Sequence, residues 1–233
     1  MTLKLGLPSK GRLMEQTFDW FGARGLALAR TGTDREYAAA ADADGVEVVL
    51  LSASEVPREL ASGRIHLGVT GSDLVREGLA DWEAQVEELA PMGFGFADLV
   101  IAVPRCWVDV DTLDDLDAAA AAFRAAHGLR LRIATKYHRM VRDFLREAGV
   151  ADYQLVDSQG ATEGTVKNLT AEAVADITSS GETLRANHLR ILSDGLIHRS
   201  QAVLWASRVA DLTAEDRAAM ARLAQRLGIR PPV

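Results

Sequence analysis

The sequence predicts an α/β protein of two lobes, with mostly parallel sheets and two strands that cross between the lobes. Apolar segments of strand length alternate with helical segments, and this alternation is typical of parallel sheets. The segment 46–52 is apolar enough to be buried on both faces of a sheet. Two further apolar segments, 94–103 and 201–207, are expected to run antiparallel to each other as the two crossings.

The other elements are expected in the following order. Strands are expected at 3–7, 66–69, 129–135, 153–156, 173–175 and 188–192. Helices are expected at 13–23, 54–61, 112–127, 184–186 and 213–227. Two more are expected after the turn 70–73, ending near Gly78, and from residue 136 onwards. Thr112 and Thr213 begin two of these helices with the spacing of a capping box. The crossings divide the chain into a first lobe, residues 1–103 and 188–233, and a second lobe, residues 104–187.

One stretch, 176–184, is the strongest candidate for a ligand site because it joins a buried strand to the start of a helix. Unpaired backbone N–H groups and the helix dipole favour an anion at such a place. The hydroxyls of Ser179, Ser180 and Thr183 add donors. A phosphate surrounded by hydroxyls indicates a sugar phosphate. The alternative is an ordinary turn that ends in a helix cap.

Two other residues of this stretch have expected roles. Gly181 lets the backbone approach a ligand closely or adopt a positive φ. Asp176, at the end of the strand, would repel a phosphate but would accept hydrogen bonds from neighbouring hydroxyls.

Three more groups of polar residues follow predicted strands, where ligands bind in open α/β sheets. Lys10 and Arg12 follow the first strand and indicate an anionic ligand, although two solvated charges would look the same. The turn Thr70 to Asp73 is either a second ligand loop or a helix cap with Ser72 in the capping role. Lys136 opens a helix start with a cluster of cations, where the helix dipole disfavours them. This cluster favours an anionic partner.

Composition excludes several classes of protein. The chain has 233 residues, 48% of them hydrophobic, which is enough for a large core. It has no run of eighteen apolar residues and no signal-peptide pattern at its start, so a cytoplasmic protein is expected. The formal charge of −7 argues against nucleic acid as a partner. The lone Cys106 excludes an internal disulfide, and the five histidines lack the spacing of a zinc site.

Taken in order, five stretches resemble the catalytic subunit of the ATP phosphoribosyltransferase family, which performs the first step of histidine biosynthesis. The matching stretches span nearly the whole chain: 7–13, 67–73, 98–104, 132–137 and 176–187. The resemblance implies a bilobal fold like that of type II periplasmic binding proteins. It also implies transfer of phosphoribose from phosphoribosyl pyrophosphate (PRPP) to N1 of ATP, with release of pyrophosphate.

The resemblance also implies roles for particular residues. Asp176 would hold the ribose hydroxyls of PRPP, and Lys136 and Glu163 would lie in the catalytic site with it. The 5-phosphate would be held by Ser179, Ser180, Gly181, Glu182 and Thr183. ATP or the pyrophosphate would be held by Lys10, Arg12, Thr70, Gly71 and Asp73.

Cofactor and partners are implied in the same way. Mg²⁺ would be bound mainly through the substrate phosphates, and the sequence does not identify its protein ligands. The chain ends without room for a regulatory domain, so it resembles the short form of the family. That form works with a separate regulatory subunit resembling histidyl-tRNA synthetase. A homodimer within a larger hetero-oligomer is therefore expected.

Two alternatives remain at this point. A ligand-binding or effector domain of the same fold is possible because fold does not determine function, but the phosphate-type loops argue against it. A type I phosphoribosyltransferase normally has two adjacent acidic residues before its PRPP loop, whereas here Ala175 precedes Asp176.

Overall fold

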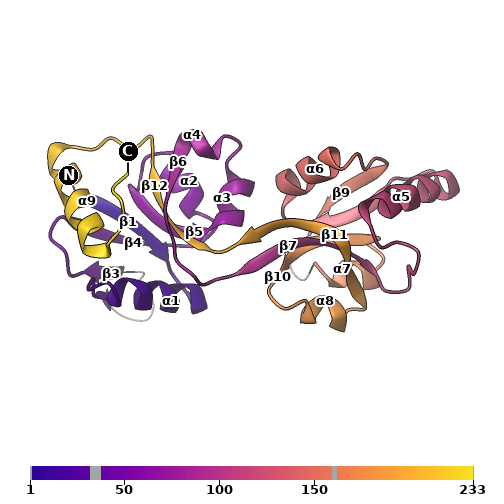
Figure 1. Ribbon diagram of the computed structural model, residues 1–233, viewed down its shortest axis with the longest axis horizontal. Helices are drawn as coiled ribbons and strands as arrows, with labels where there is room; N and C mark the ends of the chain where they lie inside the picture. The colour runs from indigo at the N-terminus through magenta and orange to yellow at the C-terminus, as the bar shows by residue number, and fades with distance from the viewer. Residues whose placement is uncertain (1, 32–37, 159–161, 233) are drawn as a thin grey trace. The chain divides into compact units, whose positions relative to one another are not determined.

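The chain folds into two compact units, each with its own sheet (Figure 1). The computed structural model describes residues 2–31, 38–158 and 162–232. The first unit contains Met1–Gly95 and Gln201–Val233, and the second contains Phe96–Ser200. The chain thus passes between the units after Gly95 and after Ser200, whereas the sequence analysis placed these passages after residues 103 and 187.

Within the described residues, the first unit has a seven-stranded sheet with the order β2-β3-β4-β1-β5-β12-β6. Its strands are β1 (Leu3–Pro8), β2 (Leu28–Thr31), β3 (Ala38–Ala41), β4 (Val46–Leu51), β5 (Leu67–Gly71), β6 (Val86–Pro91) and β12 (Ala202–Ser207). β1 pairs in parallel with both β4 and β5 at the centre of the sheet. The flanking pairs are antiparallel.

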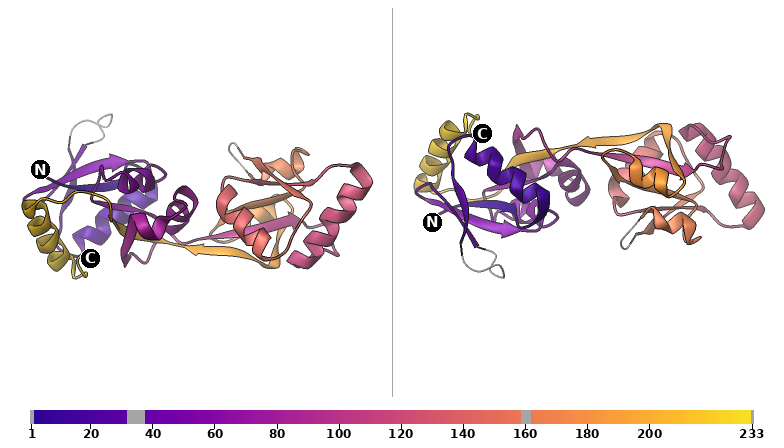
Figure 2. Two further views of the ribbon diagram at one scale, coloured as in Figure 1. Left: turned by 90° about the horizontal axis from the view of Figure 1, so that it is seen from above. Right: turned by 90° about the horizontal axis from the view of Figure 1, so that it is seen from below.

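Helices cover both faces of this sheet. The helices are α1 (Gly11–Gly22), α2 (Val56–Ala61), α3 (Ser72–Gly78), α4 (Trp82–Gln85) and α9 (Ala214–Leu227). α1 and α9 pack on one face, in a core with Leu5 of β1 and Leu204 of β12 (Figure 2). α2 and α3 pack on the other, in a core with Val203 and Trp205 of β12. Successive residues of β12 therefore enter opposite cores, as expected for a strand buried on both faces.

The second unit has a five-stranded sheet among its described residues, with the order β11-β7-β10-β8-β9. Its strands are β7 (Ala97–Pro104), β8 (Leu131–Thr135), β9 (Tyr153–Asp157), β10 (Ala173–Thr178) and β11 (Leu189–Ser200). β8 pairs in parallel with β9 and β10, and β7 pairs antiparallel with β10 and β11. Each unit therefore has a mixed sheet: the expected parallel pairs are present, and antiparallel strands extend them.

The helices of the second unit are α5 (Leu113–His127), α6 (His138–Glu147), α7 (Gly164–Lys167) and α8 (Glu182–Ala186). α5 and α6 cover one face of the sheet, where Leu99 and Ile101 of β7 are buried with them (Figure 1). α7 and α8 lie over the other face, where Val100 and Ala102 are buried.

The expected antiparallel pairing of 201–207 with 94–103 is wrong. Residues 202–207 form β12, which pairs with β5 and β6 in the first unit. The antiparallel partner of β7 on this side is the longer β11, whose Ser200 is in register with Ala97. The pairing partner of a strand is decided by tertiary contacts, which an apolar segment alone does not reveal.

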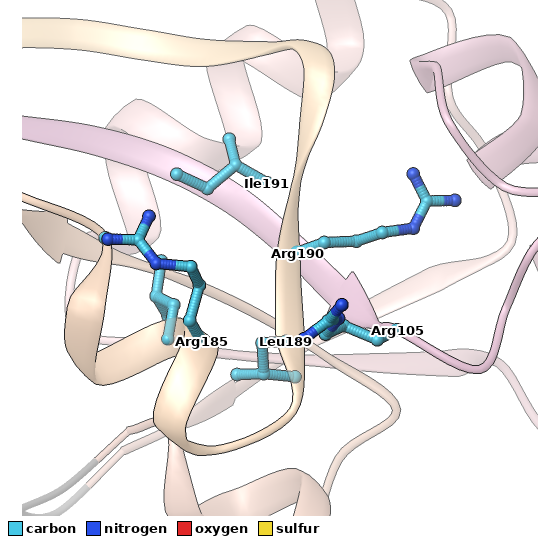
Figure 3. Close-up of a pocket in the computed structure, with 7 residues that line it drawn as sticks. Arg105, Arg185, Leu189, Arg190 and Ile191 are labelled. Carbon is cyan, nitrogen blue, oxygen red and sulfur yellow. The ribbon is translucent and has the colours of Figure 1, made fainter.

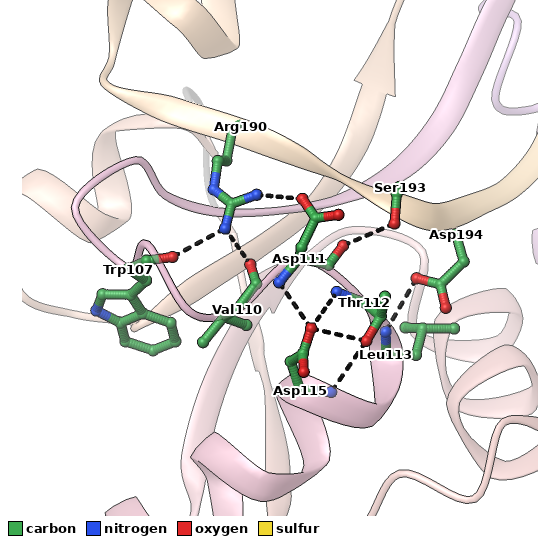
Figure 4. Close-up of polar contacts among 9 residues, drawn as sticks. All are labelled: Trp107, Val110, Asp111, Thr112, Leu113, Asp115, Arg190, Ser193 and Asp194. Carbon is green, nitrogen blue, oxygen red and sulfur yellow. Dashed lines mark hydrogen bonds and ion pairs between the residues drawn. The ribbon is translucent and has the colours of Figure 1, made fainter.

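A polar network attaches β11 to the start of α5 (Figure 4). The hydroxyl of Thr112 accepts a hydrogen bond from the backbone N–H of Asp115, and the carboxylate of Asp115 accepts from the Thr112 backbone, which completes the predicted capping box. Asp194 of β11 accepts the backbone N–H of Leu113 at 2.9 Å. Arg190, also on β11, forms an ion pair with Asp111.

Within the described part of the chain, no helix is both long enough and apolar enough to cross a membrane.

Candidate active site

The stretch predicted to bind phosphate leaves the end of β10 at the edge of the second unit's sheet. Ala173, Val174 and Ala175 are completely buried, which confirms the predicted buried strand. Asp176 is half-buried and Ile177 is 42% exposed, so the chain emerges towards solvent at this point. The turn that follows leads directly into α8.

The turn has a defined backbone geometry. Gly181 precedes α8 with φ of 71° and ψ of 1°, in the left-handed region, and therefore needs glycine for its conformation as well as for space. Its backbone N–H donates to Oγ1 of Thr178 at 2.8 Å. The backbone N–H of Glu182 donates a longer bond, 3.4 Å, to Oγ of Ser180.

Several donors of this turn have no acceptor among the residues that the structure describes. Among the described residues, nothing accepts the backbone N–H groups of Ser179, Ser180 or Thr183. All three residues are exposed. α8 has only five residues, so its dipole is small, and the local donors carry most of the attraction for an anion. The turn can bind a phosphate through backbone N–H groups and hydroxyls together.

The sequence predicts that Asp176 accepts hydrogen bonds from neighbouring hydroxyls, but no hydroxyl of the described residues donates to it. Its Oδ1 accepts the backbone N–H of the next residue, Ile177, at 2.8 Å. This contact orients the carboxylate at the end of β10 and leaves capacity on its oxygens for further donors.

Lys136 follows β8 at the same edge of the sheet. Thr135 of β8 and Ala175 of β10 are register partners on parallel strands. The next residues are Lys136, which follows β8 directly, and Asp176, which continues β10 near its carboxyl end. The backbone N–H of Tyr137 donates to Oγ1 of Thr135 at 2.9 Å, which fixes the turn into α6. Lys136 itself is exposed.

Glu163 lies on the segment that follows β9, the neighbour of β8. It is half-buried and immediately precedes α7. Beside it, Thr162 is completely buried and accepts a 2.8 Å hydrogen bond from the hydroxyl of Ser158. Since β8, β9 and β10 are parallel, the segments carrying Lys136, Asp176 and Glu163 all begin at one edge of the sheet.

The remaining predicted site residues lie in the first unit. Lys10 and Arg12 are exposed at the start of α1, directly after β1. Between them, Gly11 has a φ of 71° and provides the left-handed turn into the helix. The parallel register of β1 and β5 places this turn and the Gly71 turn at the same edge of the sheet.

The residues around the second turn are more enclosed. Thr70 is completely buried, and its hydroxyl donates to the carbonyl of Ala53 at 2.7 Å. Asp73 is only 6% exposed. Gly71, not Ser72, precedes α3, so Ser72 does not have the predicted capping role.

A pocket of about 410 Å³ borders the phosphate turn on the side of β11 (Figure 3). Its lining residues come from the end of β7, from α8 and from β11: Arg105, Gly181, Leu184, Arg185, Leu189, Arg190 and Ile191. Figure 3 shows Arg190 extending away from Arg185. The guanidinium of Arg190 forms its ion pair with Asp111 (Figure 4). No carboxylate in the described chain forms an ion pair with Arg105 or Arg185.

Arg185 was not predicted as a site residue. Its Nη2 donates to the carbonyl oxygen of Ser180 at 2.8 Å. In the sequence it reads as an ordinary cation of a short helix. The sequence feature that could have identified Arg185 is its position four residues after Gly181, since residues one helical turn apart lie close together.

Comparison with known protein families gives a match over most of the chain. Residues 52–228 match the family described as "HisG: ATP phosphoribosyltransferase". An ATP phosphoribosyltransferase of Cereibacter sphaeroides is 75% identical over 233 residues, which cover 100% of this chain and 98% of that protein. One of Mesorhizobium japonicum is 50% identical over 220 residues, with 94% of each chain covered.

Solved structures show the same fold at low sequence identity. The "ATP phosphoribosyl transferase (HisG:HisZ) complex from Thermotoga maritima" aligns with a TM-score of 0.69 and 20% identity, and covers 97% of this chain and 99% of that one. A mutant of ArgBP from T. maritima aligns with a TM-score of 0.51 and 14% identity, and covers 97% and 88%. The expected two-lobed architecture is confirmed.

Proposed function

Because the chain belongs to the ATP phosphoribosyltransferase family, we propose that it transfers the phosphoribosyl group of PRPP to N1 of ATP, the first step of histidine biosynthesis. The observation that carries the site assignment is the turn after β10. Three backbone N–H groups lie there without an acceptor in the described part of the chain, beside exposed Ser and Thr residues. Such a turn suits a phosphate monoester, which offers only acceptor oxygens.

In this proposal the turn holds the 5-phosphate of PRPP. The residues concerned are Ser179, Ser180, Gly181, Glu182 and Thr183. Asp176 follows the buried part of β10 and accepts hydrogen bonds from the ribose hydroxyls. The support for this role is its position beside the turn and the orientation given by its contact with Ile177.

The reaction breaks the bond between C1 of ribose and the pyrophosphate oxygen, and forms a bond between C1 and N1 of the adenine. The bonding electrons of the broken bond leave with pyrophosphate, and the lone pair of N1 forms the new bond. N1 already carries this lone pair, so no strong base is needed to start the attack. Catalysis depends instead on positioning two anionic substrates and on stabilising the departing charge.

Lys136 is proposed to stabilise the leaving pyrophosphate. Its strand ends beside β10, and an exposed ammonium group at this edge can approach an anion. Glu163, on the segment after β9, is proposed to lie near the ribose or the metal ion. Lys10, Arg12, Thr70, Gly71 and Asp73 are proposed to contact ATP or pyrophosphate. Thr70 would then bind through groups other than its hydroxyl, which the carbonyl of Ala53 already accepts.

Mg²⁺ fits this set of residues as an ion held mainly by substrate. The described residues contain no cluster of three or more His, Cys, Asp or Glu side chains able to hold a metal. Mg²⁺ is commonly bound by one or two carboxylates together with substrate phosphates and waters, and Asp176 and Glu163 are the carboxylates that would supply this contact. When bound, the ion neutralises charge on the pyrophosphate oxygens.

We further propose that the chain works with a regulatory subunit resembling histidyl-tRNA synthetase, as a homodimer within a hetero-oligomer. The solved relative from T. maritima is described as a HisG:HisZ complex, which supports this assignment. A cytoplasmic location is also proposed. Its support is the exposed free thiol of Cys106, which suits a reducing compartment.

The test is formation of phosphoribosyl-ATP. The purified chain is incubated with ATP, PRPP, Mg²⁺ and pyrophosphatase, with and without the regulatory subunit, and the product is followed by absorbance and identified by mass spectrometry. Mixtures lacking either ATP or PRPP serve as controls. Product in either complete mixture supports the proposal. Absence of product in both, with binding of an unrelated small molecule, contradicts it and favours a ligand-binding protein.

A further inference from the structure

We infer that Arg185 and Thr178 are positioning residues that hold the peptide unit between Ser180 and Gly181 from both sides, and thereby fix the phosphate turn. This inference rests on the proposed function and adds to it two residues that have no role in the assignment above. Neither residue needs to touch substrate.

The first observation is a pair of opposed hydrogen bonds. The carbonyl oxygen of Ser180 accepts from Nη2 of Arg185 at 2.8 Å, and the N–H of Gly181 donates to Oγ1 of Thr178 at 2.8 Å. In a trans peptide the carbonyl and the N–H point in opposite directions. The two contacts therefore restrain the same plane at its two ends, and the plane cannot rotate without breaking both.

The second observation is the conformation that this peptide enters. Gly181 is in the left-handed region, with φ of 71°. Glycine is free to leave this region at little cost, so the residue type alone does not fix the turn. The two hydrogen bonds supply the restraint that glycine lacks.

The third observation concerns the acceptor that Arg185 occupies. A carbonyl oxygen that turned towards the bound phosphate would repel it. With the Ser180 carbonyl held by a guanidinium group, this acceptor is occupied and does not compete with the N–H and hydroxyl donors of the turn. The guanidinium also lies close to the turn, since its Nη1 is 2.9 Å from the position that a Cβ on Gly181 would occupy.

Arg185 keeps its charge available for this role. No carboxylate in the described structure pairs with it, and its Nη2 lies 2.8 Å from the Ser180 carbonyl oxygen of the turn. An unneutralised cation next to a phosphate site attracts the ligand electrostatically over a long range, because the net charge of the ligand is negative.

The chain contains a matched control for the local contact. Arg217 of α9 donates through Nη2 to the carbonyl of Leu212, five residues earlier, at 2.7 Å, just as Arg185 does to Ser180. Both arginines are exposed. Arg217 belongs to the other unit and to no part of the proposed site, so Arg217→Met measures what the loss of such a contact does to the fold alone.

The experiment compares KM for PRPP and for ATP in the chain assembled with its regulatory subunit. The variants are Arg185→Met, Thr178→Val, the conservative Thr178→Ser, and Arg217→Met. Losing one hydrogen bond to the turn is expected to raise KM for PRPP about tenfold in Arg185→Met and about fivefold in Thr178→Val. KM for ATP stays unchanged. Thr178→Ser and Arg217→Met are expected to keep the wild-type KM for PRPP.

Calorimetric binding of PRPP to the same proteins gives a second measurement that does not depend on turnover. The inference is overturned if KM for PRPP is that of wild type in both Arg185→Met and Thr178→Val. It is also overturned if KM for ATP rises as much as KM for PRPP in these variants, or if Arg217→Met raises KM for PRPP by the same factor. If wild type forms no phosphoribosyl-ATP, the proposed function fails; the inference then fails with it unless PRPP still binds and weakens in Arg185→Met and Thr178→Val.

Discussion

Thr135 and Ala175 are register partners on the parallel strands β8 and β10. The residues that follow them are therefore neighbours at this edge: the cationic Lys136 directly after β8, and the anionic Asp176 near the end of β10. An enzyme that separates pyrophosphate from a ribose needs both charges close together: a cation for the departing phosphates and a carboxylate for the sugar hydroxyls. The strand register brings these two charged residues to neighbouring positions.

Asp176→Asn is expected to lower kcat by about 10- to 100-fold, because hydrogen bonds to a charged group contribute about 1.5–3 kcal/mol. The amide can still accept the backbone N–H of Ile177, so the fold and the melting temperature should not change. Steady-state kinetics with both substrates measure the effect. Asp109→Asn, at an exposed carboxylate before α5, is the matched control. Normal turnover in Asp176→Asn would remove this residue from the site.

Lys136→Met should lower kcat by about tenfold or more, because a cation that stabilises a leaving group acts mainly in the transition state. KM for PRPP should change less than kcat. Lys167→Met, at an exposed lysine of α7, serves as the control and should behave as wild type. A large rise in KM with unchanged kcat would instead mean that Lys136 binds substrate without favouring the transition state.

Gly181→Ala should destabilise the second unit and weaken PRPP binding together. A residue with Cβ costs about 1–2 kcal/mol in the left-handed region, and the new Cβ would lie 2.9 Å from Nη1 of Arg185. The melting temperature should fall by a few degrees, and KM for PRPP should rise. Gly22→Ala is the control, since a Cβ there meets no atom within 4 Å and its φ is ordinary. Equal behaviour of the two variants would contradict the account of the turn.

The capping box of α9 makes a prediction about stability at low pH. Hydrogen bonds from the hydroxyl and then the backbone N–H of Thr213 hold the pKa of Asp216 below its ordinary value. A carboxylate with a lowered folded-state pKa stabilises the protein above its unfolded pKa, and this contribution is lost as the pH falls through the folded value. Stability should therefore decline on acidification below about pH 4.

Thr213→Ala removes the hydroxyl and should lower the melting temperature by a few degrees at neutral pH. In this variant the melting temperature should also fall less steeply with acidification, because the pKa of Asp216 then returns towards its ordinary value. Thermal melts between pH 3 and pH 7 compare this variant with wild type. Parallel pH profiles for the two proteins would show that this carboxylate is not responsible.

The sequence reveals the parallel core of each sheet, since strands such as β4 and β10 are short apolar runs that lead into helices. It also reveals the capping boxes at Thr112 and Thr213, which depend on residues three positions apart. It does not reveal β3, because the alanines of 38–41 favour a helix and become a strand only by pairing with β2 and β4. The partner of β12 was missed for the same reason.

Some features of the candidate site are likewise predictable from the sequence, and others are not. The edge at which Lys136 and Asp176 lie is predictable, because ligand loops follow the carboxyl ends of parallel strands. The unpaired donors of the turn are also predictable from a strand, a glycine and a helix start. The bond between Arg185 and Ser180 is not, since it depends on the side-chain conformation of an exposed arginine. The same holds for the contact of Asp176 with Ile177.

The assignment of the turn to the 5-phosphate of PRPP is tested most directly by inhibition with ribose 5-phosphate. This compound keeps the phosphate and the sugar and lacks the pyrophosphate. Its inhibition constant is measured against PRPP in wild type and in Ser180→Ala, with ATP fixed. The account predicts inhibition that competes with PRPP and weakens about fivefold or more in the variant, as one hydrogen bond to the phosphate is lost. Inhibition that does not compete with PRPP, or equal inhibition constants in the two proteins, would contradict it.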